Sequence, residues 1–170
     1  MSTKISITTF TDPMMGLSYE CEPIFRKLKT HFGENIHFKY NMCVLVKNVY
    51  DFVDPADLEV NREFALENYN RRLAEIYKSE EGIMQMPICM EGFQLFSTRH
   101  TSSLPLNLAY KAAQLINAAK ADLLLYNLRY ATIVDCRPTT HLEEILKVVR
   151  KTGIDEEKFL PRKRRESPLL

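Results

Sequence analysis

The stretch TFTDPMMGLSYECEP, residues 9–23, decides how this chain folds. It follows an alternating apolar and polar run, Ile5 to Thr8, and leads into an amphipathic segment that ends near Gly33. A second run typical of a strand follows at residues 36–40. This order predicts a strand, a tight connection, a helix and a second strand. A connection that leaves the end of a strand and opens a helix is where α/β proteins commonly place a functional site.

A recognisable pattern runs through this stretch, at Asp12, Pro13, Met14, Gly16, Tyr19, Glu22 and Pro23. It resembles the site loop of the DsbA-like branch of the thioredoxin superfamily, especially its protein-disulfide isomerases. That loop reads Asp-Pro-Met-Cys-x-Trp-Cys and is followed by an aromatic residue. The resemblance implies an α/β protein with a thioredoxin-like β-α-β unit and a large α-helical insertion.

The chain departs from the family pattern where the family holds its two cysteines. Met15 stands in place of the attacking cysteine, Ser18 in place of the resolving cysteine, and Leu17 in place of the tryptophan. Disulfide exchange needs a nucleophilic thiolate and a second thiol that resolves the mixed disulfide. A methionine thioether cannot ionise, and a serine hydroxyl cannot close a disulfide. The family site positions Met15 and Ser18 are therefore predicted to be incompetent for dithiol chemistry.

The rest of the chain is predicted to be mainly helical. Asp54 before Pro55 is typical of a helix start, and the spacing of Thr140 and Glu143 predicts a capping box. Residues 80–101 lose helical periodicity and are predicted to form an irregular crossing loop. No strand pattern follows Phe159, whereas relatives continue with a cis-proline, two antiparallel strands and a helix. The resemblance thus implies a fold whose C-terminal part is truncated.

We expect three parts along the chain. Residues 1–50 form the thioredoxin-like βαβ unit, residues 51–160 form the helical insertion, and residues 161–170 form a basic flexible tail. A sheet of only two strands has unpaired edges, and an exposed edge favours pairing with another chain. A homodimer is therefore one expected arrangement.

Composition limits the other classes of function. The chain has 170 residues and a net charge of +1, so its overall charge does not favour nucleic acid. It has no apolar run of about 18 residues and no signal-like start, which predicts a cytoplasmic protein that does not bind membranes. The four histidines lack the spacing of metal ligands, and no metal or cofactor is expected. The four scattered cysteines are expected to be buried small hydrophobes.

Two enzymatic alternatives stay open. Cys21 lies three residues after Ser18 and could act as a displaced nucleophile, alone or with Cys43. A disulfide oxidoreductase or isomerase would then remain. The second alternative is a glutathione-dependent transferase or isomerase. Kappa-class glutathione transferases and hydroxychromene-carboxylate isomerases share the fold, but the serine that they use corresponds to Met15 and not to Ser18.

The favoured interpretation is a redox-inactive module that binds a protein or peptide partner, or serves as an adaptor. Its groove is expected between the site loop and the helical insertion. The expected binding residues are Asp12, Met14, Leu17 and Tyr19, with Met15 beside them.

Overall fold

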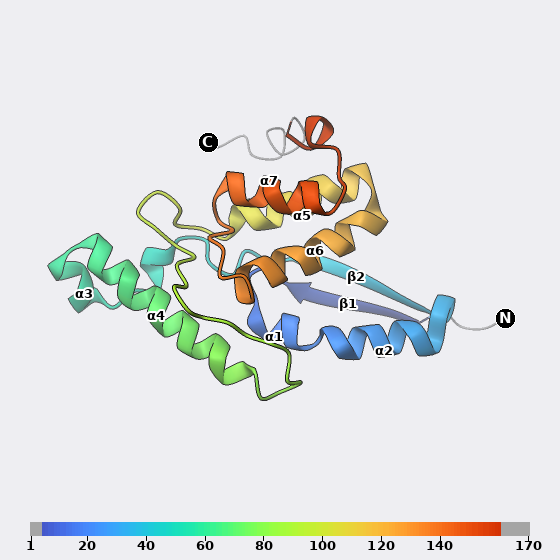
Figure 1. Ribbon diagram of the computed structural model, residues 1–170, viewed down its shortest axis with the longest axis horizontal. Coiled ribbons are helices and arrows are strands. Elements are labelled where there is room, and N and C mark those ends of the chain that lie inside the picture. The colour runs from blue at the N-terminus through green and yellow to red at the C-terminus, as the bar shows by residue number, and fades with distance from the viewer. Residues whose placement is uncertain (1–4, 161–170) are drawn as a thin grey trace.

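The two predicted strands lie side by side at the centre of the βαβ unit. The computed structural model describes residues 5–160, in which β1 (Ile5–Thr11) pairs in parallel with β2 (Ile36–Met42). The register runs from Ile5 opposite Ile36 to Thr11 opposite Met42. The strands are connected by α1 (Gly16–Glu20), α2 (Glu22–Phe32) and the short 3-10 helix η1 (Gly33–Asn35) (Figure 1). The predicted strand–helix–strand order is confirmed.

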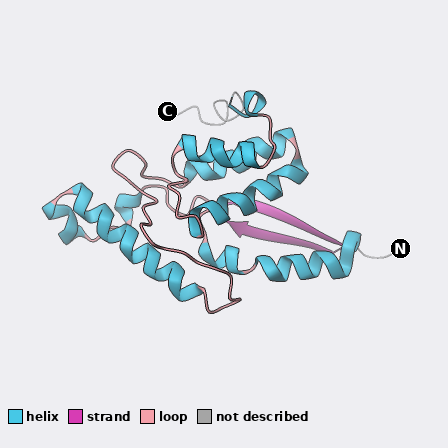
Figure 2. Ribbon diagram, viewed as in Figure 1, coloured by secondary structure: helices cyan, strands magenta, loops and turns pink. Residues whose placement is uncertain are grey.

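Outside the two strands, the described residues form helices joined by loops, as Figure 2 shows. In chain order, those that follow β2 are η2 (Val49–Asp51), α3 (Pro55–Val60), α4 (Arg62–Glu80), α5 (Leu104–Ile116), α6 (Ala118–Ile133) and α7 (Leu142–Lys151). The predicted start at Pro55 is confirmed, because the Asp54 side chain caps α3 by accepting from the Ala56 N–H at 2.9 Å. This arrangement is a thioredoxin-like fold with a large helical insertion.

Only one face of the sheet is covered by helices. Phe38 and Tyr40 are buried on that face, where Phe25 of α2 and Tyr110 of α5 pack against them. Side chains point alternately to the two faces of a strand. The alternate positions are exposed: Ser6, Thr8, Phe10, His37 and Lys39. Within residues 5–160, β1 also has no strand on its second edge.

The amphipathic helix α2 is less buried than its sequence suggests. Its hydrophobic positions form one stripe, yet no α2 residue is buried, and Ile24 and Phe32 are 40% and 41% exposed. Phe25 and Leu28 are only partly buried. A two-stranded sheet offers too little surface to cover the whole stripe, so both ends of this amphipathic helix stay exposed.

The main core lies inside the helical insertion. Its fully buried members include Leu106, Leu124, Leu128, Ile145 and Val149. Figure 1 shows α5, α6 and α7 lying together on one side of the sheet, with the long loop 81–103 running between them and α4. The predicted crossing loop is therefore confirmed.

Buried side chains hold the crossing loop in place. Asn70 of α4 accepts from the Leu95 and Phe96 N–H groups and donates to the Phe96 carbonyl. Thr140 donates to the Leu95 carbonyl, so it is not free to cap α7. The residue before α7 is His141, which makes no capping hydrogen bond through its side chain. The predicted capping box is wrong because Thr140 is used by the loop.

None of the helices within residues 5–160 is both long and apolar enough to cross a membrane. The expected basic tail, 161–170, lies outside the described residues.

Candidate functional site

Asp12 organises the loop that leaves the end of β1. One carboxylate oxygen, Oδ1, accepts from the Met14 N–H at 3.0 Å. The other, Oδ2, accepts from the Leu45 N–H at 3.0 Å, from Ser103 Oγ at 2.7 Å and from Asn107 Nδ2 at 2.8 Å. Asp12 therefore joins the site loop to the segment after β2 and to the start of α5.

The Asp12 carboxyl is almost inaccessible, with 1% of its surface exposed. Burial raises the pKa of this carboxyl, and its four hydrogen-bond donors oppose that effect. Such a side chain cannot touch a ligand at the surface. Asp12, which the sequence suggested as a binding residue, is an anchor of the loop.

Met14 and Tyr19 are also taken into the core. Met14 is 1% exposed and its carbonyl accepts from the hydroxyl of Tyr77 in α4. Tyr19 is fully buried and stacks on Tyr126 of α6, with ring centroids 6.5 Å apart. Of the expected contact residues, Leu17 stays 41% exposed. Met15, at the N-cap of α1, is partly exposed.

Ser18 ends a chain of buried polar groups. Its Oγ accepts from Thr11 Oγ1 at 2.9 Å, and Thr11 Oγ1 accepts from Arg129 at 2.7 Å. Arg129 of α6 is fully buried and forms an ion pair with Glu22 at 2.7 Å. Burial lowers the pKa of Arg129, and Glu22 opposes that effect. Ser18 is thus a structural hydroxyl held beneath the loop.

The sequence did not point to the partners that position this loop. Ser103, Asn107 and Arg129 come from the insertion and meet the loop only in the folded chain. The one available signal was Arg129, the single charged residue within residues 123–133 of α6. A charged residue in such a run indicates a buried ion pair or a functional group.

The four cysteines are free, and none is buried. Cys43 and Cys89 are exposed, while Cys21 and Cys136 are partly buried, so the expectation of four buried cysteines is wrong. Cys21 occupies the break between α1 and α2, and Cys43 follows the end of β2. Neither lies at the family's two site positions.

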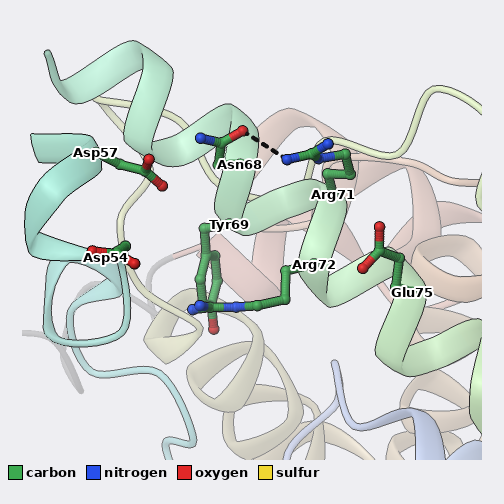
Figure 3. A pocket seen from close by; sticks show the side chains of 7 residues that line it. All are labelled: Asp54, Asp57, Asn68, Tyr69, Arg71, Arg72 and Glu75. Carbon is green, nitrogen blue, oxygen red and sulfur yellow. Dashed lines mark hydrogen bonds between the residues drawn. The ribbon is translucent and has the colours of Figure 1, made fainter. Parts of the chain in front are cut away.

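A separate surface pocket of about 350 Å³ lies on α3 and α4 (Figure 3). Its lining carries charges of both signs, from Asp54, Asp57, Asn68, Tyr69, Arg71, Arg72 and Glu75. Arg71 donates to Asn68 at 3.1 Å, and the Arg72 guanidinium lies 5.4 Å from the Tyr69 ring centroid. No residue of the site loop lines this pocket. Among residues 5–160, no cluster of three or more His, Cys, Asp or Glu side chains could hold a metal ion.

Solved structures share this architecture at low sequence identity. A candidate protein disulfide isomerase from Nitrosomonas europaea superposes with a TM-score of 0.72 at 15% identity, covering 95% of this chain and 71% of its own. The cytosolic disulfide reductase DsbM from Pseudomonas aeruginosa gives 0.67 at 16% identity, with 96% and 71% covered. DsbM has also been solved with GSH.

A search of curated proteins gave no match. The family described as thioredoxin matches residues 8–167, which is nearly the whole sequence. The paired strands, the helical insertion and the loop at the end of β1 agree with this match. The chain belongs to the thioredoxin family and has a DsbA-like fold.

Proposed function

We propose that this chain is a redox-inactive module that binds a peptide or protein partner, or serves as an adaptor, on a DsbA-like fold. One observation carries the proposal: the two positions where relatives hold cysteines are Met15 and Ser18. Ser18 is 8% exposed and its hydroxyl is engaged by Thr11. The site loop therefore keeps its place at the end of β1 without a group that can exchange disulfides.

The surface around this loop supports binding. Met15 and Leu17 are accessible on the loop, and Val44 and Leu45 are 37% and 50% exposed on the segment after β2. Asp12 joins these two segments through the Leu45 N–H. Accessible apolar side chains on a fixed loop suit an apolar peptide segment. We propose this patch, Met15, Leu17, Val44 and Leu45, as the contact surface.

Insulin reduction tests the absence of dithiol chemistry. The wild-type chain is expected to give no thiol-dependent turnover above the rate of the reductant alone. The double variant Met15→Cys, Ser18→Cys places two thiols at the family positions and is expected to gain turnover, which also shows that the assay can detect it. Wild-type turnover that disappears in Cys21→Ser or Cys43→Ser would overturn the proposal in favour of a disulfide oxidoreductase.

Peptide binding tests the contact surface. Fluorescence polarisation with a labelled, reduced and alkylated insulin B chain would measure affinity. Leu17→Asp is expected to weaken binding about tenfold, because it removes the burial of one leucine side chain. Val60→Asp is the matched control, since Val60 is 62% exposed at the end of α3, and it should bind like the wild type. Equal loss in both variants would contradict this surface.

Two further points belong to the proposal. We propose a cytoplasmic location, supported by the cytosolic assignment of DsbM. A glutathione-dependent reaction is the remaining alternative, because DsbM has been solved with GSH. Titration calorimetry with reduced glutathione decides it: saturable binding that Met15→Ala weakens would favour that alternative over the binding module.

A further inference from the structure

The two cysteines outside the βαβ unit meet in the folded chain. Cys89 lies in the crossing loop and is exposed, and Cys136 lies in the turn after α6 and is partly buried. The Sγ atom of Cys136 is 2.6 Å from the carbonyl oxygen of Cys89. Neither residue belongs to the site loop, and the proposed binding function uses neither of them.

The backbone holds these residues together independently of their side chains. The Cys89 N–H donates to the carbonyl of Ile133, the last residue of α6, at 3.1 Å. The Arg137 N–H donates to the Ala131 carbonyl at 2.9 Å, which folds the turn back on the helix. Cys136 has a φ of 50°, in the left-handed region that non-glycine residues rarely adopt. The turn is therefore a defined structure that presents Cys136 to Cys89.

The Cys136 sulfur lies against the backbone of Cys89. A carbonyl oxygen is bonded through its carbon to its own Cα, so the Cys136 sulfur lies at most about 5.4 Å from the Cα of Cys89. Disulfides have Cα atoms about 4.4–6.8 Å apart and Cβ atoms about 3.5–4.5 Å apart. The contact of the Cys136 sulfur with Cys89 places the two residues next to each other, which this geometry requires.

The partial burial of Cys136 and the exposure of Cys89 set the order in which the two thiols react. Burial, and then the neighbouring Cys89 thiol, raises the pKa of Cys136 to about 12. Cys136 is therefore a thiol at neutral pH and a poor first nucleophile. Cys89 is the exposed partner, so a disulfide in solution reaches it first.

We propose that Cys89 and Cys136 form a redox modification site, in which a small-molecule disulfide such as glutathione disulfide closes a reversible bond between the crossing loop and the end of α6. The Cys89 thiolate attacks one sulfur of glutathione disulfide and releases one glutathione. Cys136 then loses its proton and attacks the Cys89 sulfur, which breaks the mixed disulfide and releases the second glutathione. Two electrons pass from the protein to the oxidant, and the two thiol protons end on the two released glutathiones.

Mass spectrometry of the oxidised full chain tests this proposal. The protein is equilibrated with mixtures of reduced and oxidised glutathione, quenched in acid, alkylated and digested. The expected result is loss of two free thiols and a peptide that links Cys89 to Cys136. The matched control is the double variant Cys21→Ser, Cys43→Ser, which should form the same link. Cys89→Ser should form no intramolecular link, and Cys136→Ser should retain one glutathione on Cys89.

A second measurement separates the bond from simple thiol reactivity. The disulfide closes a long loop, so thermal unfolding of the oxidised Cys21→Ser, Cys43→Ser chain should shift upward by about 10 °C relative to the reduced form. The Cys136→Ser variant should show no such shift. A link between any other pair of cysteines, or uniform glutathione addition without a link, would overturn the proposal. Insulin turnover is not part of this readout, so this inference and the proposed binding function succeed or fail separately.

Discussion

A single carboxylate fixes the site loop, which makes Asp12 the most consequential residue of the βαβ unit. Replacing it by alanine removes the buried carboxylate that accepts from the Leu45 and Met14 N–H groups, from Ser103 and from Asn107. Asp12→Ala is expected to lower the free energy of unfolding by about 3 kcal/mol, because buried donors lose their partners. Asp12→Asn keeps one acceptor oxygen and should lose less.

Urea denaturation measures the effect of Asp12→Ala. Asp135→Ala is the control, because Asp135 is exposed, and it should change stability by less than about 0.5 kcal/mol. Equal stability of Asp12→Ala and the control would show that the hydrogen bonds of Asp12 are dispensable.

The buried ion pair between Arg129 and Glu22 gives a second prediction about single residues. Arg129→Met leaves the largely buried Glu22 carboxylate without its cation and is expected to cost about 3–5 kcal/mol. The double variant Arg129→Met, Glu22→Met removes both charges and should recover much of that loss. A double-mutant cycle of unfolding free energies checks this expectation. Additive losses would mean that the ion pair has little coupling energy.

The lowered pKa of His100 makes the folding stability depend on pH. Its ring stacks on His141 with centroids 3.6 Å apart, and burial, followed by His141 and Arg99, lowers the pKa of His100. The unfolded chain therefore binds the proton more readily than the folded chain. The neutral ring is favoured by the fold, so stability is highest above the ordinary pKa of 6.5 and falls as pH drops through the lowered value.

Removing the ring should flatten this pH dependence. We expect His100→Gln to lose less stability than the wild type between about pH 7.5 and about pH 5.5. Unfolding free energies from urea at the two pH values give the difference. His31→Gln is the control, because His31 is exposed on α2. An unchanged pH dependence in His100→Gln would exclude His100 as the titrating group.

At the scale of elements, Gly16 sets how closely α1 approaches α4. A Cβ at Gly16 would lie 2.8 Å from the buried Tyr77 ring and 2.1 Å from a carboxylate oxygen of Glu80. Gly16→Ala is therefore expected to cost about 1–3 kcal/mol through overpacking. Gly82→Ala is the control, since nothing lies within 4 Å of its Cβ. Thermal unfolding of both variants compares them, and similar midpoints would contradict close packing of α1 on α4.

Local sequence signals predicted some elements and not others. The β1-α-β2 order and the start of α3 were predictable because strand alternation and the Asp54 cap act between near neighbours. The Thr140 capping box was not, because the buried Leu95 carbonyl competes for that hydroxyl. The amphipathic pattern of α2 does not show how deeply the helix is buried, because its burial depends on the width of the sheet.

The sequence predicted the chemistry of the site but not the burial of its residues. The sequence shows that Met15 and Ser18 cannot exchange disulfides, since that conclusion needs only the chemistry of two side chains. It could not show that Met14 and Tyr19 are buried, because α4 and α6, which cover them, lie far along the chain. The chain positions of Arg129 and Glu22 likewise give no sign that the two residues meet.

At the scale of the whole molecule, the open side of the sheet predicts self-association. Within residues 5–160, β1 has one unpaired edge, and the exposed face beside it carries Phe10 at 68% exposure. An unpaired edge favours pairing with a second copy. Light scattering is expected to give about twice the chain mass of 19.8 kDa. Phe10→Lys should shift the protein toward monomer, whereas Val60→Lys should not, and a wild-type monomer at all concentrations would contradict the prediction.

The hydrogen bonds of Asp12 have a consequence for recognition. Donors from the site loop, the segment after β2 and α5 all converge on one carboxylate, so these parts cannot drift apart without breaking bonds at the same group. A partner that docks on Met15 and Leu17 meets a platform that is already ordered. The protein then loses little conformational entropy when the complex forms, so even a small contact area can support measurable affinity.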